Sequence, residues 1–314
     1  MPPAEIAALR RRVARRAALV RQRTRAKNEV HAVLARCLLG RSPGADLFGR
    51  SGRAWLSRQA LPAEERETVD GCRRQLDFLD AEIRAIDRGL AGWALSSPEA
   101  RRLMTIPGVG VGTAVTSMAA IGEIARFSSP RKLVAYLGLD PRVRQSGDEP
   151  PRHGRISGRG NPQARSVLVE AAWTALRQPG PLPAFGQRIR ARRGAQVAAV
   201  AVARKLAVLA WQLLTKGEDY AFARPSQVRA KLRRAERAAG APRLPTRHGG
   251  RPVSASASER AAERELSEQA EAAYRRLVAD WRASGAAPRQ RGAGVPPGRA
   301  SQAARQGSAP DPAL

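Results

Sequence analysis

The first hundred residues show two long helical patterns of apolar positions, separated by a turn-rich break at 40–52. Residues 4–39 contain no Gly or Pro, and apolar side chains recur through them at helical spacing. A second pattern runs through 62–93, where apolar residues alternate in steps of three and four; they are Val69, Cys72, Leu76, Leu79, Ile83, Ile86 and Leu90. This spacing is typical of a coiled-coil seam. We therefore expect residues 1–100 to form a helical hairpin around this seam, with dimerisation through the seam as the alternative.

The rest of the chain predicts a compact helical domain over residues 101–222 and a basic tail over residues 223–314. Within the domain, apolar patterns predict helices at 163–176 and 195–214. Within the tail, residues 223–256 and 285–314 are rich in Arg, Pro, Gly, Ala and Ser, a composition typical of disorder, and one helix is expected between them at 258–283. The predicted fold class is mainly α.

The charge balance adds a polyanionic partner to this picture. The chain has 56 Lys and Arg against 27 Asp and Glu, giving a formal net charge of +29. Such an excess repels itself in a compact chain, whereas each phosphate that it neutralises releases condensed counterions. A GC-rich genome explains why the basic residues are mostly Arg, but it does not explain their surplus over acids. We therefore expect nucleic acid as a partner.

Other features of the composition argue against membrane, secreted and metal-centred proteins. No apolar run approaches the roughly 20 residues that a membrane span needs, and no apolar stretch follows the basic N-terminus as in a secretory signal. Cys37 and Cys72 are too few for a disulfide framework, and with three scattered histidines they make no metal site. We expect no membrane partner, no metal or cofactor in this chain, and a cytoplasmic, nucleoid-associated location.

One Gly-rich motif, residues 103–114, has the form of a helix-hairpin-helix element. Pro107-Gly108-Val109-Gly110 follows an apolar stretch, and Thr113 belongs to the helix that comes next. Glycines allow a tight turn with positive φ, and the free N–H groups at the start of the second helix can bind a phosphate oxygen. Gly108, Gly110 and Thr113 are therefore candidate backbone contacts. The alternative is a helix–helix turn that touches no nucleic acid; the high net charge favours binding.

Basic residues supply the other candidate contacts. A predicted loop after Pro141 carries Arg142, Arg144, Arg152, His153, Arg155 and Arg159. Its Ser146 could act as a nucleophile beside guanidinium groups, although residue chemistry alone favours an ordinary surface serine, since no general base adjoins it. In the predicted helix 195–214, Arg204 and Lys205 either reach phosphate or extend outward from a buried helix. The polar stretch 21–28 contains Arg25 and Lys27.

Several of these motifs, taken in order, resemble the C-terminal domain of the insertion-sequence 110/116/902 transposase family, which includes pilin-gene invertases and bridge-RNA-guided recombinases. The similar segments are Ile-Pro-Gly-Val-Gly, Phe-Ser-Ser-Pro-Arg-Lys-Leu, Tyr-Leu-Gly-Leu-Asp-Pro-Arg, Gln-Ser-Gly, Arg-Gly-Asn and Ala-Val-Ala-Arg-Lys-Leu, within residues 103–220. The resemblance implies DNA transposition or site-specific recombination guided by a structured RNA. It also implies that Ser146 is the catalytic serine, and it makes Arg25 and Lys27 candidate RNA or DNA contacts.

The family's full-length members begin with a ribonuclease-H-like domain whose acidic tetrad binds magnesium, and no strands of that kind are predicted here. We therefore expect a truncated transposase or gene remnant that is not active alone, with magnesium needed only alongside the absent domain. A homo-oligomer, or association with a full-length transposase, is expected. The alternatives are a non-catalytic nucleic-acid-binding protein and a module that modulates a full-length transposase through the seam.

Overall fold

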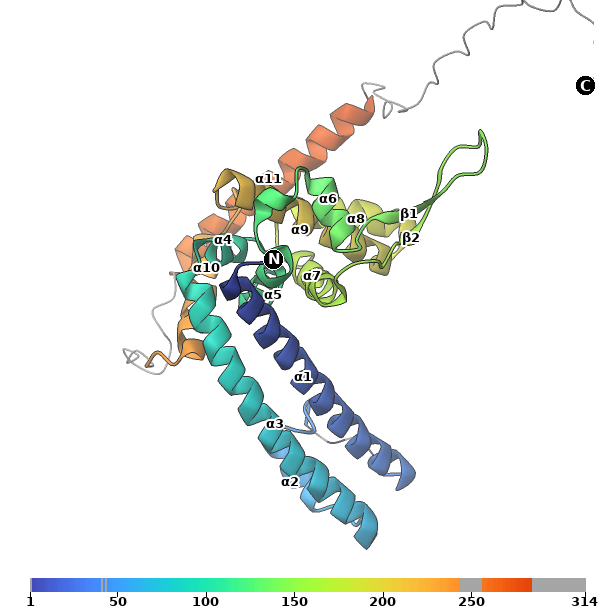
Figure 1. Cartoon of the computed structure of the whole chain (residues 1–314), viewed down its shortest axis with the longest axis vertical. Helices are drawn as coiled ribbons and strands as arrows, with labels where there is room; N and C mark the ends of the chain where they lie inside the picture. Colours follow the sequence, from blue (N-terminus) through green and yellow to red (C-terminus); the bar gives the residue numbers. More distant parts are fainter. Residues whose placement is uncertain (1, 41, 43, 243–255, 284–314) are drawn as a thin grey trace, which may run out of the picture. The chain divides into compact units, whose positions relative to one another are not determined.

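The prediction of a mainly helical fold is confirmed by a computed structural model of the chain, which describes residues 2–40, 42, 44–242 and 256–283 (Figure 1). In these residues the helices are joined by short turns, and a single pair of short strands is present. By contact density the chain divides into one large unit, Met1–Ala272, and a second unit from Ala273 onward. The fold and the candidate sites described below belong to the large unit.

Two long helices, α1 (Ala4–Arg36) and α3 (Ala63–Ser96), lie side by side and extend away from the rest of the large unit (Figure 1). Six of the seven predicted seam residues are buried, namely Val69, Cys72, Leu76, Leu79, Ile83 and Leu90. They pack with residues of α1, as in the cluster of Leu19 with Leu79 and Ile83. Arg16–Asp87 and Arg23–Asp80 ion pairs join the same two helices. The expected break at 40–52 is shorter than predicted, because the short helix α2 (Arg50–Ser57) begins inside it.

The compact part of the large unit is built around helix α9 (Ala195–Lys216). Around it or beside it lie α4 (Pro98–Met104), α5 (Val111–Ile121), the 3₁₀ turn η1 (Ile124–Arg126), α6 (Pro130–Tyr136), α7 (Pro162–Ala175) and α8 (Pro181–Arg193). The helices predicted at 163–176 and 195–214 are confirmed as α7 and α9. Their contact surfaces consist largely of Ala, Leu and Val, so the helices approach closely and few aromatic side chains are needed.

Helix α9 is strongly apolar, although Arg204 and Lys205 interrupt its apolar residues. This 22-residue helix is the one helix among the described residues that is long and apolar enough to cross a membrane. Half of its most apolar window is nevertheless buried inside the fold, and Val202, Leu206 and Leu213 belong to the main hydrophobic core. Since the core helix of a globular protein has the same length and composition, the buried position explains its apolar character.

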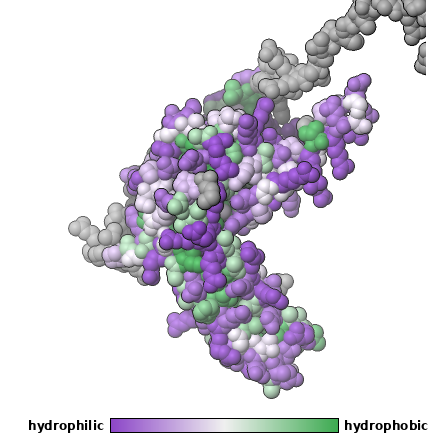
Figure 2. Space-filling model, in the orientation of Figure 1, coloured by the Kyte–Doolittle hydropathy of each residue, from purple (hydrophilic) through white to green (hydrophobic). Residues whose placement is uncertain are grey.

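The Arg-rich segment that the sequence predicted as a loop forms a β-hairpin instead. Strand β1 (Pro141–Arg144) pairs antiparallel with β2 (Arg152–Ile156). The register places Arg144 opposite Arg152, and an irregularity interrupts it between Pro141 and Val143. Neither strand has the alternating apolar pattern by which a strand is normally recognised, because the hairpin has no buried face of its own. The hairpin protrudes from the helices around it (Figure 1), and hydrophilic residues cover most of it (Figure 2).

The predicted disorder of residues 223–256 was wrong for their first half, which forms helix α10 (Pro225–Ala239) and packs against α3. Ala235 is buried in the main core and Leu232 is half-buried against it, so a narrow apolar stripe is enough to hold this otherwise basic helix. The helix expected at 258–283 is confirmed as α11 (Ala257–Ala283), and its Glu263 accepts a 2.9 Å hydrogen bond from the Ser226 amide of α10. The disorder predicted for 243–255 and 285–314 falls outside the described residues.

Candidate nucleic-acid interface

The predicted helix-hairpin-helix segment forms two helices, α4 and α5, joined by a turn at residues 105–110. Ile106 and Val109 of this turn are buried in the core. Gly108 has a φ of +82°, and a Cβ atom at this position would lie 2.2 Å from the Ala171 carbonyl oxygen of α7. Gly108 was predicted as a nucleic-acid contact, but its backbone approaches α7. Packing alone therefore explains why this position is a glycine.

Gly110 and Thr113 lie at the start of α5, where both are half-buried and Gly112 between them is exposed. Gly110 is the N-cap of the helix, and it offers no side chain to the first N–H groups of α5. A Cβ atom at Gly110 or Gly112 would meet nothing within 4 Å, so these glycines leave open space in front of the helix. The first N–H groups of a helix have no acceptor within it, and they carry the positive end of the helix dipole. The geometry is suitable for an anion, and the contact of Gly110 and Thr113 with a phosphate stays a prediction.

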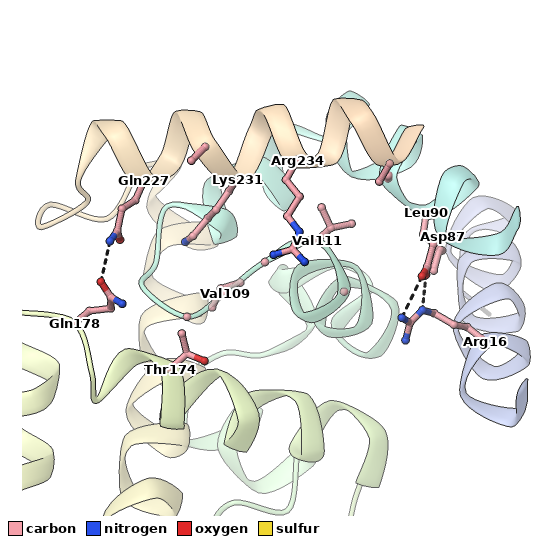
Figure 3. A pocket seen from close by; sticks show the side chains of 16 residues that line it. Arg16, Asp87, Leu90, Val109, Val111, Thr174, Gln178, Gln227, Lys231 and Arg234 are labelled. Carbon is pink, nitrogen blue, oxygen red and sulfur yellow. Dashed lines mark hydrogen bonds and ion pairs between the residues drawn. The ribbon is translucent and has the colours of Figure 1, made fainter. Parts of the chain in front are cut away.

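A pocket of about 580 Å³ opens beside this turn, between the start of α5, the side chains of α10 and the ends of α1 and α3 (Figure 3). Lys231 and Arg234 extend into it from α10, and the Arg16–Asp87 ion pair closes one side. Sequence reasoning missed Lys231 and Arg234 because it assigned their segment to the disordered tail. The spacing of Val228, Leu232 and Ala235 was the signal that could have identified α10 as an amphipathic helix.

Lys231 holds α10 against the turn. Its Nζ donates hydrogen bonds of 2.7 Å to the carbonyl oxygens of both Met104 and Ile106, at the end of α4. Burial, and secondarily the positive charge of Arg224, lower the pKa of Lys231 to about 8. The ammonium group thus caps the Met104 carbonyl at the end of α4 and adds a second bond to the Ile106 carbonyl of the turn, which also accepts from the Val109 amide. Arg234 is exposed and leaves a guanidinium group on the open side of the pocket.

The β-hairpin brings a second set of predicted residues together. Arg142, Arg144 and Arg159 line a shallow pocket of about 610 Å³ at the base of the hairpin, together with Asp140 and Ser157. Arg142 donates from Nη2 to the Ser157 carbonyl oxygen at 3.2 Å. Arg155 is exposed on β2 and is not among the residues that line this pocket. The structure therefore brings three of the predicted contact residues together, in a hairpin that the sequence assigned to a loop, and their contact with nucleic acid stays a prediction.

Ser146 lies in the exposed tip that joins β1 to β2. Its carbonyl oxygen accepts a 3.3 Å hydrogen bond from the Glu149 amide, which closes the turn. Its hydroxyl makes no hydrogen bond to another residue in the part of the chain that the structure describes. The side chain of His153, the nearest histidine in sequence, falls outside that part. The tip is accessible to a large ligand, and within the described residues it contains no preassembled nucleophile–base pair.

The remaining predicted contacts lie apart from the hairpin. Arg25 is exposed on α1, whereas Lys27 is half-buried with its Nζ 4.7 Å from the centre of the Phe48 ring. The stretch 21–28 is not polar all round, since Ala26 is buried. Arg204 and Lys205 are both exposed on α9 and can reach solvent without leaving their helix. The structure does not join these four residues into one site with Arg142, Arg144 and Arg159.

Comparison with known proteins places these features in a family. The model of the transposase IS116/IS110/IS902 family matches residues 100–187, which run from α4 into α8. The chain is 32% identical over 208 residues to the transposase for insertion sequence element IS1111A of Coxiella burnetii, covering 64% of this chain and 57% of that protein. It is 33% identical over 216 residues to the transposase for insertion sequence element IS1328 of Yersinia enterocolitica, covering 64% and 61%.

The chain is also similar to the pilin gene-inverting protein of Moraxella bovis. The two are 29% identical over 122 residues, which cover 38% of this chain and 37% of that protein. The chain thus spans about three fifths of the length of the two transposases named above. The family match covers α4, α5, the β-hairpin and α7, whereas α1, α3 and α10, which also line the pocket beside the α4–α5 turn, lie outside it. Residues 100–187 thus match the transposase IS116/IS110/IS902 family, and the two relatives that align over most of this chain's length are transposases.

Proposed function

We propose that this chain takes part in DNA transposition or site-specific recombination, with Ser146 as the nucleophile. The observation that carries the proposal is the position of this serine, at the exposed tip of a hairpin with exposed arginines on both strands. The family match supports the recombination role at a coarser level, because the relatives are transposases and a gene-inverting protein. The α4–α5 turn is a second, backbone-directed contact through Gly110 and Thr113.

In the proposed reaction the Ser146 oxygen attacks a DNA phosphodiester. A new serine–phosphate ester forms, the bond from phosphorus to the leaving strand's oxygen breaks, and that oxygen takes up a proton as the serine loses one to solvent or a base. Arg144, the arginine of β1 nearest to Ser146 in sequence, would stabilise the negative charge that gathers on the phosphoryl oxygens. No group of three His, Cys, Asp or Glu side chains that could hold a metal ion occurs among the described residues, so this chain's own part in the scheme is carried by Ser146 and the arginines.

In the same proposal, RNA binds to the exposed face of the long helix α1. The protein is located in the cytoplasm, in association with the nucleoid. Arg21 and Arg25 are exposed on α1. Arg23, which lies between them in sequence, is directed toward α3 and pairs with Asp80 at 3.1 Å. A structured guide RNA would bind this exposed face by its phosphates. Self-association or association with a longer transposase belongs to the same proposal. Burial of the seam against α1 counts against the seam as the contact surface for such a partner.

A non-catalytic nucleic-acid-binding protein is the second candidate function. It is favoured by one observation, the lack of a hydrogen-bonded base at the Ser146 hydroxyl within the described residues. In this case the hairpin and the α4–α5 turn would bind the nucleic-acid backbone without cutting it. Such contacts fix position on a duplex and carry no sequence information.

Trapping of a covalent protein–DNA adduct separates the two functions. The full chain, alone and with a full-length relative and its RNA, is incubated with labelled DNA that carries the element's ends. Denaturing gels then detect the serine–phosphate ester. With the relative and its RNA present, we expect an adduct that contains the unmodified chain and none that contains Ser146→Ala, with DNA affinity unchanged within about twofold. Ser128→Ala, a change at another exposed serine, is the matched control. DNA binding without an adduct under all of these conditions would favour the non-catalytic function.

A further inference from the structure

The base of the β-hairpin is firmly attached to the helical core. Ser157, just after β2, donates its amide to the Asp140 carbonyl oxygen at 2.7 Å and its hydroxyl to Asp140 Oδ1 at 2.6 Å. Arg165 of α7 donates to the Leu137 and Gly158 carbonyl oxygens at 3.3 and 3.1 Å, so it joins the two ends of the hairpin. These bonds fix the direction in which the hairpin leaves the core.

Beyond this base the hairpin makes no core of its own. Arg142, Val143 and Arg144 of β1 and Arg152 of β2 are exposed, and Val143 retains 55% of its surface. An isolated two-stranded hairpin is at best marginally stable in water, and it normally depends on packing against another element. An exposed ribbon that is held at its base is suited to contact with a partner that covers it.

The charges on the ribbon indicate the chemistry of that partner. Arg144 and Arg152 are direct cross-strand neighbours, so both side chains lie on one face, where like charges destabilise the pair. The acid nearby does little to relieve this, because the 3.2 Å ion pair between Arg152 and Glu149 leaves the two side chains 81% and 66% exposed. Phosphate groups or guanine edges placed over this face would each accept a bidentate pair of hydrogen bonds from one guanidinium group.

The shape of the ribbon favours a duplex over a single strand. Paired strands lie about 4.8 Å apart, and the major groove of B-form DNA, about 12 Å wide, admits a two-stranded ribbon. The major groove of A-form RNA is too deep and narrow for side chains to read. We propose that the β1–β2 hairpin enters the major groove of duplex DNA with its Arg144–Arg152 face toward the DNA. This proposal rests on the proposed function, in which DNA is the substrate. It specifies in addition that the DNA is double-stranded, that the hairpin binds in the major groove, and that Arg144 and Arg152 make the contact.

Binding of the full chain to three probes of matched length tests the proposal: duplex DNA, single-stranded DNA and duplex RNA, over a range of salt concentrations. The key variant is Arg144→Ala/Arg152→Ala. Its control is Arg190→Ala/Arg192→Ala, which removes the same charge from two exposed positions of α8. We expect the hairpin variant to lose about tenfold more affinity for duplex DNA than the control loses. The slope of log affinity against log salt should also fall by about 1 for each phosphate contact removed.

The loss should be specific to duplex DNA and to the shape of the guanidinium group. For single-stranded DNA and duplex RNA, the hairpin and control variants should lose equal affinity. Arg144→Lys/Arg152→Lys should keep the salt slope but recover only part of the affinity, since an ammonium group cannot make the bidentate contact. Because both side chains are exposed, circular dichroism and thermal unfolding should show unchanged folding in each variant. Equal losses by the hairpin and control variants on duplex DNA would overturn the proposal.

Groove-selective ligands provide the second arm of the experiment. Methyl green, which occupies the major groove, should weaken duplex binding by the unmodified chain but have little effect on the Arg144→Ala/Arg152→Ala variant. Netropsin, which occupies the minor groove, should affect both chains equally. Netropsin competing selectively with the unmodified hairpin would overturn the groove assignment. If the unmodified chain binds none of the three probes, the proposed function fails as well; if it binds but the hairpin variants behave as the control, only this inference fails.

Discussion

The α4–α5 turn and the β1–β2 hairpin are both Gly-containing segments next to cations, yet the fold treats them in opposite ways. The turn is enclosed by α7 and α10, with Ile106 and Val109 buried, whereas the strands of the hairpin are almost entirely exposed. Buried neighbours determine the conformation of the turn, and a few bonds at the base determine the direction of the hairpin. The same residue types therefore serve packing in one segment and contact in the other.

The two segments also differ in how their charge is used. The ammonium group of Lys231 is directed into two backbone carbonyls beside the turn, so most of its hydrogen-bonding capacity is used inside the protein. On the hairpin, Arg144 and Arg152 face each other across the strands and lie in solvent. A change in the turn should therefore reduce stability before it reduces binding, and a change on the hairpin should do the reverse.

The largest expected effect on this comparison comes from Gly108→Ala. The new Cβ would lie 2.2 Å from a backbone oxygen of α7, and its φ of +82° disfavours any L side chain. We expect the free energy of unfolding to fall by about 2 to 5 kcal/mol, measured by chemical denaturation, because both overpacking and backbone strain contribute.

Gly112→Ala is the matched control for that substitution. Gly112 lies at the start of α5 with open space around its missing side chain, so alanine should leave stability unchanged or raise it by at most about 1 kcal/mol. If Gly108→Ala were as stable as Gly112→Ala while DNA affinity fell, the turn would be a ligand site first and a packing element second. That result would reverse the contrast drawn between the two segments.

Lys231→Met should lower the free energy of unfolding by less than Gly108→Ala does. It removes the ammonium group that caps the carbonyls but keeps an apolar side chain of similar length. The Met104 carbonyl oxygen would lose its bond to Nζ, while the Ile106 carbonyl oxygen would keep its bond from the Val109 amide. An unsatisfied buried acceptor costs about 1 to 3 kcal/mol, and relief from burying the ammonium offsets part of this. We therefore expect a net destabilisation of about 1 to 2 kcal/mol at pH 7 in denaturant titrations.

Lys231 also predicts a pH dependence with a definite sign. Burial lowers its pKa to about 8, below the ordinary value of 10.5, so between these values the unfolded chain binds more protons than the folded one. The free energy of unfolding should then rise with pH from about 8 to 10.5, by about 2 to 3 kcal/mol. Tyr220, whose pKa burial raises to about 12, acts in the opposite direction above pH 10. The difference between the unmodified chain and Lys231→Met isolates the lysine contribution, and a flat difference over this range would contradict it.

Sequence patterns predicted the elements that have a wide apolar face and missed those that do not. The α3 seam and the helices α7 and α9 were predicted because their buried positions recur at regular spacing along the chain. Helix α10 was missed since its buried surface is little more than Ala235 and the half-buried Leu232. The hairpin was missed because a strand without a buried face has no alternation to detect.

The candidate site shows the same division. The local chemistry of the hairpin arginines is visible in the sequence, so Arg142, Arg144 and Arg159 could be selected before their common pocket was known. Lys231 and Arg234 could not be assigned to the α4–α5 turn, because more than a hundred residues of chain separate them from it. Likewise, the packing role of Gly108 depends on Ala171 of α7, and nothing in the local motif indicates that contact.

The smallest effect should come from the base of the hairpin, through Ser157→Ala. This change removes the 2.6 Å bond to Asp140 Oδ1 but keeps the 2.7 Å backbone bond, so the local loss should be about 1 kcal/mol. Because the hairpin contributes little to the core, the midpoint of global unfolding should hardly move. Hydrogen exchange should instead accelerate about fivefold at the Ser157 and Gly158 amides, which bond to Asp140 and Gly138. Ser146→Ala, at the tip of the same hairpin, should leave these amides unchanged. Faster exchange throughout α7 and α9 would mean that the hairpin and the core unfold together, and the hairpin would then be part of the core rather than an attached ribbon.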